Sequence, residues 1–294
     1  MCRLFGMSGG ERPLRATFWL LEAPDSLAQQ SRHNPDGYGI ATYDHDGRAV
    51  IDKRAAAAYE DELFAREAKE LESPTFVAHV RYASTGGKTL ENTHPFEQRN
   101  RVFAHNGYIG NLPALDARLG PATELVHGET DSERYFALIT SEIAANRGDV
   151  GAGIAAAARW IARELPVFSL NCVLATRDEL WALRYPDTHP LMLLERAIGG
   201  PTGQRHLDAA SPAGTVRVRS AALSDRATVI IATEQMDEDS GWRTLEPGEL
   251  VMVDRDLQVK SRTAIDAPPA HLVRLEDLDP AAARSQHDYG THSG

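Results

Sequence analysis

The sequence predicts an α+β fold in which sheets and helices occupy separate layers. Runs rich in Val, Ile, Leu and aromatic residues recur along the chain, as expected of β-strands. Amphipathic helical patterns are grouped between two sets of these runs and do not alternate with them one by one. Strict alternation would favour a Rossmann-type parallel sheet, so the observed order indicates layered α+β architecture.

Eight segments are expected to form strands. Each is a short apolar or β-branched run, bounded by Gly, Asp, Pro or Asn residues that commonly end strands. The expected strands are residues 3–7, 38–43, 75–82, 101–105, 168–176, 180–185, 227–233 and 250–254.

Three segments are expected to form helices. Apolar residues recur every three or four positions after Asp131, with Thr130 or Asp131 placed to cap the helix. A second pattern covers residues 151–165 and is stopped by Pro166. A third, more charged helix is expected over residues 60–71.

The 294 residues are enough for one large domain. Residues 1–260 contain no convincing linker and are expected to form that domain. Residues 261–294 mix prolines, alanines, histidines and glycines with little periodicity, so we expect a flexible tail. The acidic run of residues 237–239 is expected to be a solvated loop.

Charge and composition exclude several classes of protein. With 31 Lys and Arg against 42 Asp and Glu, the formal net charge is −11, which argues against nucleic acid as a partner. The most apolar long stretch, residues 150–162, is shorter than the roughly 20 residues that a membrane helix needs. The N-terminus has no secretory signal pattern, so a cytoplasmic protein is expected.

Two cysteines, Cys2 and Cys172, cannot form a disulfide framework or a four-cysteine zinc site. Cys172 lies in an apolar run and is expected to be an inert buried thiol. No metal and no cofactor are expected, because the histidines lack a ligand spacing such as H-E-x-x-H. These histidines are His79, His94, His105 and His127, and of them His94 is the one expected to approach a functional site.

Cys2 is the candidate nucleophile. If Met1 is removed, the thiol and a free α-amine belong to the same residue. An α-amine titrates near ~7.7–8.0, so it can accept the thiol proton at physiological pH. The alternative is that Cys2 is an ordinary second residue that keeps Met1.

Polar clusters at predicted strand ends and at one helix start favour the catalytic alternative, because such positions commonly display functional groups. In chain order with Met1-Cys2, they resemble the motifs of the class II glutamine amidotransferases, the N-terminal-nucleophile glutaminases. The matching stretches are residues 36–39 (DGYG), 79–86 (HVRYASTG), 91–96 (ENTHPF), 105–107 (HNG) and 129–133 (ETDSE).

The resemblance implies a role for each matching residue. Arg81 would bind the α-carboxylate of glutamine, with the Ser84 hydroxyl nearby, and Asp131 would bind its α-ammonium group. Asn106 and Gly107 would form the oxyanion hole. Taken singly, Arg81 could be a surface ion-pair former, Asp131 an ordinary helix start, and Asn106-Gly107 a hairpin turn.

The resemblance also implies a four-layer αββα sandwich of two mainly antiparallel sheets, and a stand-alone, single-domain member of the family. The leading expectation is hydrolysis of the glutamine γ-amide through a γ-glutamyl thioester, releasing glutamate and ammonia, alone or for a separate synthase subunit. The second is hydrolysis of a larger γ-glutamyl amide, as in ergothioneine biosynthesis. The third is a glutamine-binding regulator without catalysis.

Overall fold

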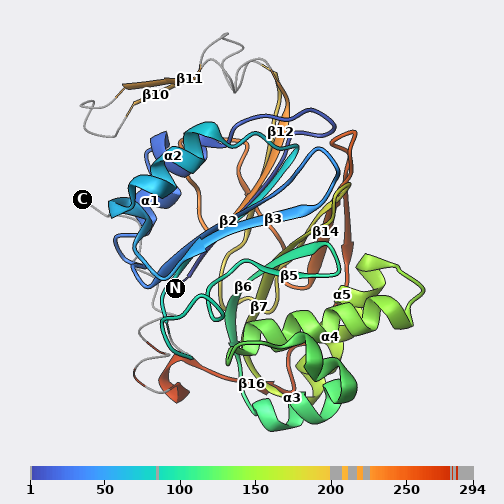
Figure 1. Cartoon of the computed structure of the whole chain (residues 1–294). Helices are drawn as coiled ribbons and strands as arrows, with labels where there is room; N and C mark the ends of the chain where they lie inside the picture. The colour runs from blue at the N-terminus through green and yellow to red at the C-terminus, as the bar shows by residue number, and fades with distance from the viewer. Residues whose placement is uncertain are drawn as a thin grey trace.

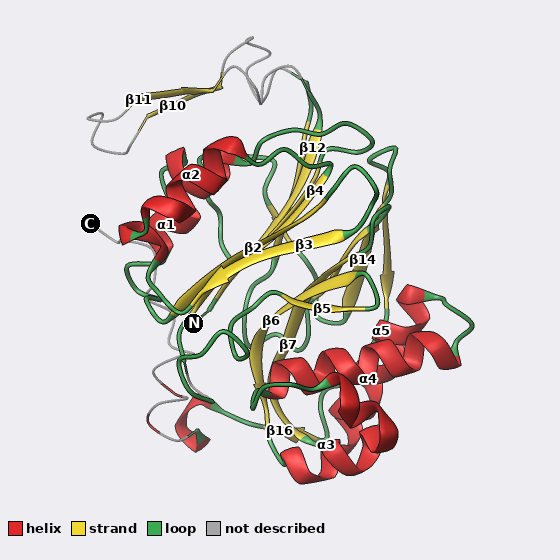
Figure 2. Cartoon of the chain, in the orientation of Figure 1, coloured by secondary structure: helices red, strands yellow, loops and turns green. Residues whose placement is uncertain are grey.

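A computed structural model describes residues 2–83, 86–198, 207–210, 217–220 and 226–278, together with residues 280 and 283. Two seven-stranded sheets pack face to face, and helices cover the outer face of each sheet (Figure 1, Figure 2). The predicted four-layer α+β sandwich is therefore confirmed.

The first sheet has the order β13-β9-β12-β1-β4-β2-β3, and every neighbouring pair in it is antiparallel. Strand β1 therefore lies in the interior of the sheet, between β4 and β12. The strands are β1 (Arg3–Ser8), β2 (Gly37–Tyr43), β3 (Ala49–Arg54), β4 (Thr75–Arg81), β9 (Met192–Arg196), β12 (Thr228–Ala232) and β13 (Arg243–Thr244).

The second sheet has the order β15-β14-β8-β7-β6-β5, and β16 pairs in parallel with the start of β7. A separate hairpin joins β10 (Leu207–Ala210) to β11 (Arg217–Ser220). The strands of the second sheet are β5 (Phe96–Gln98), β6 (Arg101–Ile109), β7 (Pro166–Ala175), β8 (Leu180–Leu183), β14 (Glu249–Val253), β15 (Val259–Thr263) and β16 (His271–Leu272).

Helices α1 (Leu27–Gln30) and α2 (Glu62–Glu70) pack on the first sheet, with a π-helical turn at Phe18–Glu22. Helices α3 (Leu112–Leu119), α4 (Asp131–Ala145) and α5 (Val150–Glu164) pack on the second. Three 3-10 turns complete the helical segments at Ala58–Glu60, Gly120–Leu125 and Leu275–Asp277. None of the helices in this described part of the chain has the length and apolar character needed to cross a membrane.

The three helices predicted from the sequence are α2, α4 and α5. Thr130 caps α4 as expected, because its hydroxyl accepts the Glu133 backbone N–H at 3.3 Å. Helix α5 is capped by Asp149, which accepts the Ala152 backbone N–H at 2.8 Å. These caps fix where the two long helices begin.

One apolar core lies between each sheet and its helices, and a third fills the space between the two sheets. Leu4 and Val77 from the first sheet and Val102 and Val173 from the second belong to it. The approach is close at Gly6, where an added Cβ would lie 3.0 Å from a methyl carbon of Val173. Side chains alternate between the two faces of a strand, so this core identifies which residues of each strand face the other sheet.

The predicted tail begins too early. Residues 261–263 belong to β15, which pairs with β14, and both Ala264 and Ile265 are buried in the core beneath α5. The Ala270 backbone N–H then donates to the Ala162 carbonyl at 2.8 Å. The chain up to residue 273 is thus held on the domain, and most of the predicted tail beyond residue 278 lies outside the described residues.

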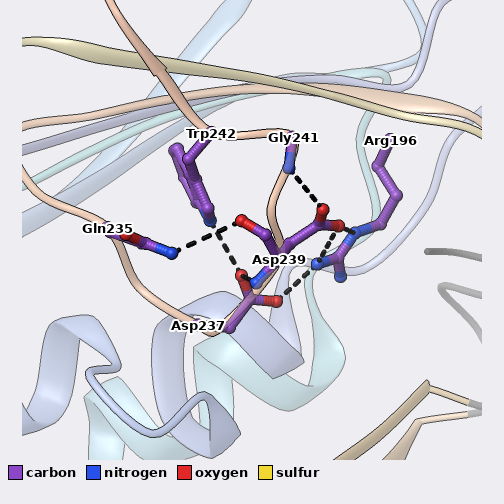
Figure 3. A network of polar contacts seen from close by, with 6 residues as sticks. All are labelled: Arg196, Gln235, Asp237, Asp239, Gly241 and Trp242. Atoms are coloured by element: carbon purple, nitrogen blue, oxygen red, sulfur yellow. Dashed lines mark hydrogen bonds and ion pairs between the residues drawn. The ribbon is translucent and has the colours of Figure 1, made fainter.

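The acidic run that the sequence predicts as a solvated loop is instead an internal ion-pair network (Figure 3). The Arg196 guanidinium, whose side chain is 1% exposed, pairs with both Asp237 and Asp239. It also lies over the ring of Trp19, 4.7 Å from the ring centroid. The Trp242 ring N–H donates to Asp237 at 2.8 Å. The loop after β12 is therefore held by buried charges.

Replacing Asp239 with alanine is expected to lower the free energy of unfolding by about 2–4 kcal/mol, because the buried guanidinium loses one of its two carboxylates. Urea denaturation measures the change. Glu238→Ala, at an exposed position of the same loop, is the matched control and should change stability by less than about 0.5 kcal/mol. Equal effects of the two variants would contradict a structural role for the network.

Candidate functional site

The candidate nucleophile directly precedes β1. Leu4 and Gly6 of this strand face the second sheet, and Cys2 follows the same alternation. The Cys2 thiol is half-buried and accepts the Tyr82 backbone N–H at 3.4 Å. It also lies 3.5 Å from the Tyr82 carbonyl oxygen, to which it donates. Among the described residues, contacts with the Tyr82 backbone thus hold the thiol at the end of the first sheet.

Arg81, the last residue of β4, is brought next to Cys2. It is 4% exposed, and its Nη1 donates to the Gly87 carbonyl at 3.0 Å. Burial lowers the pKa of its guanidinium, while the nearby Cys2, Asp36 and Asp131 act in the opposite direction. An arginine remains charged at neutral pH, so the site holds a buried cation between a thiol and a carboxylate.

Asp131 is the first residue of α4, and its carboxylate is buried at the helix N-terminus. Its Oδ2 accepts the Ile109 backbone N–H at 2.8 Å, which ties the helix to the end of β6. The partial positive charge of a helix N-terminus stabilises a carboxylate at this position.

Asn106 and Gly107 are not in a hairpin turn, and the predicted strand does not end before them. They lie inside β6, opposite Asn171 and Leu170 of β7. Asn106 shares its face with Val102 and Ala104, so it faces the first sheet. Its side chain is fully buried, and neither its Nδ2 nor its Oδ1 has a hydrogen-bond partner among the described residues.

Each unpaired group of such a buried amide costs about 1–3 kcal/mol, a cost that an apolar residue at this position would not carry. Gly107 is required for a different reason. A Cβ at this position would lie 1.9 Å from the carbonyl oxygen of Ser169, so no other residue fits without moving β7.

The loop that follows β4 is held by Asp36, a residue for which the sequence suggested no role. Its Oδ2 accepts the Ala83 backbone N–H at 2.9 Å, and its Oδ1 pairs with the Lys88 ammonium. Asp36 belongs to the motif at residues 36–39, which was the signal in the sequence. Ser84, whose hydroxyl was predicted to lie near the bound glutamine, is outside the described residues.

A second set of hydrogen bonds, which the sequence analysis did not predict, holds the far end of this loop. The Asn92 side-chain amide donates to the Glu129 carboxylate at 3.2 Å, and the Glu129 backbone N–H donates back to Asn92 at 2.8 Å. The Gly87 backbone N–H also donates to Glu129, at 3.1 Å. The 86–93 loop is therefore fixed against the segment that leads into α4.

Three buried histidines lie in this region: His79 and His94 near Arg81, and His105 near Asp131. The rings of His79 and His94 lie with their centroids 4.2 Å apart, and the charge of Arg81 acts on both imidazoles. Burial lowers the pKa of His79 to about 3, that of His94 well below its usual value, and that of His105 in the same direction. Among the described residues, no group of three or more His, Cys, Asp or Glu side chains could hold a metal ion.

Cys172 is buried on the opposite face of the second sheet, beneath α4. Burial raises the pKa of its thiol to about 12. A thiol of this kind is almost entirely protonated at neutral pH, in agreement with the predicted inert role.

Comparison with known proteins identifies one family. The family model of the class-II glutamine amidotransferases matches residues 1–273. YafJ of Escherichia coli is 26% identical over 260 residues, covering 85% of this chain and 96% of YafJ. The γ-glutamyl-hercynylcysteine sulfoxide hydrolase of Mycobacterium tuberculosis is 29% identical over 268 residues, covering 86% of this chain and 93% of the hydrolase.

Solved structures agree with the fold. The phosphoribosylpyrophosphate amidotransferase of Bacillus subtilis superimposes with a TM-score of 0.63 at 19% identity, over 91% of this chain and 50% of that enzyme. A class-II domain protein from Silicibacter pomeroyi superimposes with a TM-score of 0.58 at 18% identity, over 89% of this chain and 99% of that protein. The chain therefore spans nearly all of some relatives and about half of others.

Proposed function

The chain belongs to the class-II glutamine amidotransferases, and on that premise we propose that Cys2, freed by removal of Met1, hydrolyses the side-chain amide of glutamine. The observation that carries the proposal is the position of Arg81, a buried cation within electrostatic range of both Cys2 and Asp131. Glutamine carries an α-carboxylate, an α-ammonium group and an amide, so its binding site needs a cation, an anion and a nucleophile close together.

In the proposed complex, the Arg81 guanidinium binds the α-carboxylate through its planar fork of N–H donors. The Asp131 carboxylate binds the α-ammonium group. The Ser84 hydroxyl adds a hydrogen bond to the bound glutamine. These contacts direct the side-chain amide toward the Cys2 thiol.

The proposed reaction has two halves. The Cys2 α-amine takes the thiol proton, directly or through a water, and the thiolate attacks the amide carbon. The Asn106 Nδ2 and the Gly107 backbone N–H stabilise the tetrahedral oxyanion, at roughly 3–4 kcal/mol for each donor. The proton passes to the leaving nitrogen, and ammonia departs from a γ-glutamyl thioester. Water then attacks the thioester, which yields glutamate and restores the thiol.

Asp131→Asn is expected to raise KM for glutamine by about 10- to 100-fold with a smaller change in kcat, because it removes the charge that pairs with the ammonium group. Asparagine still offers an oxygen to the Ile109 N–H, so the strand contact can persist. Steady-state release of ammonia at varied glutamine measures both constants. A fall in kcat at unchanged KM would contradict this role.

The proposed function is tested with 6-diazo-5-oxo-norleucine, a glutamine mimic that alkylates such nucleophiles. Mass spectrometry should find a chain that lacks Met1 and bears one adduct on Cys2, and the unlabelled protein should release ammonia from glutamine. Processed protein that neither reacts with the mimic nor hydrolyses glutamine would overturn glutamine as the substrate.

The second candidate substrate is a larger γ-glutamyl amide. It is favoured by the Mycobacterium tuberculosis hydrolase, a relative of nearly the same length. Arg81, Asp131 and the oxyanion hole serve either substrate, because both present the same γ-glutamyl group. Hydrolysis of γ-glutamyl anilides or peptides with kcat/KM well above that for glutamine would decide for this candidate.

The proposal extends to the protein that accepts the ammonia and to the cellular compartment. The fructose-6-phosphate aminotransferase of Bradyrhizobium diazoefficiens is 25% identical over 98% of this chain, but that match covers 40% of the aminotransferase. We propose that a separate synthase subunit uses the ammonia, and that the protein works in the cytoplasm, where a nucleophilic thiol stays reduced.

A further inference from the structure

Strand β6 is fastened to the first turn of α4 at two positions, one on each side of Asn106 and Gly107. On one side, the His105 Nδ1 lies 2.9 Å from the Ser132 hydroxyl oxygen. On the other side, the Ile109 backbone N–H donates to Asp131 at 2.8 Å. The oxyanion-hole residues therefore lie between two anchors on the helix that also carries Asp131.

The direction of the hydrogen bond between His105 and Ser132 follows from the other contact of the His105 ring. The His105 Nε2 lies 3.0 Å from the Ser169 carbonyl oxygen, which can only accept, so Nε2 carries the proton. In the neutral ring Nδ1 is then bare and accepts from the Ser132 hydroxyl. Both residues are buried, so water does not compete for either contact.

The side chain of His105 points away from the nucleophile. His105 and Phe103 lie on the face of β6 that packs against the helical layer, whereas Asn106 lies on the other face, toward the first sheet. His105 thus reaches α4 and β7 at once, and it fixes the backbone of β6 from the side opposite to the reacting atoms. This geometry suits a residue that sets the position of its neighbours and does not touch the substrate.

We propose that His105 and Ser132 are positioning residues for the oxyanion hole, holding Asn106 and Gly107 in register with the Cys2 thiol. The proposal rests on the proposed function, because it needs Asn106 and Gly107 to stabilise the oxyanion. No side-chain partner among the described residues holds the Asn106 amide, so its position depends on the backbone that carries it. An error of about 1 Å in such a group can cost about 100-fold in rate.

Ser132→Ala is the decisive variant, because it removes the hydroxyl and leaves the helix intact. We expect kcat for glutamine to fall by about 10- to 100-fold. The dissociation constant of glutamate, which has the same α-groups, should change by less than about 3-fold, since Arg81 and Asp131 remain. Ser132→Thr, which keeps the hydroxyl, should restore most of kcat.

The matched control is Thr140→Val on the same helix. The Thr140 hydroxyl is buried and has no hydrogen-bond partner among the residues described, so its loss should leave kcat unchanged. Thermal unfolding of all three variants shows whether each is folded at the assay temperature.

Three outcomes would overturn the inference: an unchanged kcat in Ser132→Ala, an equal fall in the threonine variant, or a fall in glutamate affinity as large as that in kcat. Failure of the proposed function is recognised separately. It appears in the wild-type protein, as absence of both the Cys2 adduct and of turnover with any γ-glutamyl amide, and it would overturn both proposals together.

Discussion

Cys2→Ala is expected to lower the rate of ammonia release from glutamine by at least about 10⁴-fold, the largest effect of any substitution in the chain. Without the thiol there is no thioester, and water would have to attack the amide directly. The fold should persist, because among the described residues the thiol hydrogen-bonds the Tyr82 backbone and no side chain. Ammonia release at saturating glutamine measures the loss, and circular dichroism checks the fold.

Cys172→Ala is the matched control, since it removes the other cysteine of the chain. Cys172 contacts the Tyr135 hydroxyl on the helical side of the second sheet, so its loss should leave turnover and labelling of Cys2 unchanged. Residual activity above about 1% in Cys2→Ala, or an adduct on Cys172 in the wild-type protein, would show that another group is the nucleophile.

The second large effect is expected on acidification. The pKa values of His79, His94 and His105 are all lowered in the folded protein, that of His79 from 6.5 to about 3. Below pH 6.5 the unfolded chain therefore binds protons that the folded protein does not bind. Stability is fully present above pH 6.5 and falls as the pH drops toward the folded pKa values. For His79 the loss approaches about 1.4 kcal/mol per pH unit between pH 6.5 and its folded pKa, and His94 and His105 add to the loss in the same direction.

Urea denaturation between pH 7.5 and 5 measures this slope. His79→Leu should reduce it by about one proton, because leucine fills the buried position and cannot bind a proton in the unfolded chain. His45→Gln is the control, since the His45 side chain is 90% exposed. A slope that is the same in wild-type protein and His79→Leu would show that His79 is protonated in the folded state.

The interior strands were predictable, because burial on both faces requires continuous apolar runs. This is true of β1, β4, β7 and β12, which match their expected segments to within one or two residues. Strand β3 was missed for a physical reason. It lies at the edge of the first sheet, and its residues alternate between partly buried and exposed, with Asp52 and Arg54 on the open face.

At the candidate site, residue types were predictable and their surroundings were not. The Asn-Gly pair at 106–107 has strong turn preference, but pairing with β7 and the close approach of Ser169 override it. The acidic pair Asp237 and Asp239 looked solvated because its partner, Arg196, is about 40 residues away in sequence. Long-range partners of this kind leave no local signal.

The place of β1 has a consequence for synthesis on the ribosome. Cys2, the proposed nucleophile, is synthesised well before residues 228–232, yet the strand that follows it gains its second neighbour only when these residues of β12 have been completed. Any shorter nascent chain leaves β1 as an edge strand. The sheet that carries the proposed site is therefore completed late in synthesis, only after β12 has joined β1.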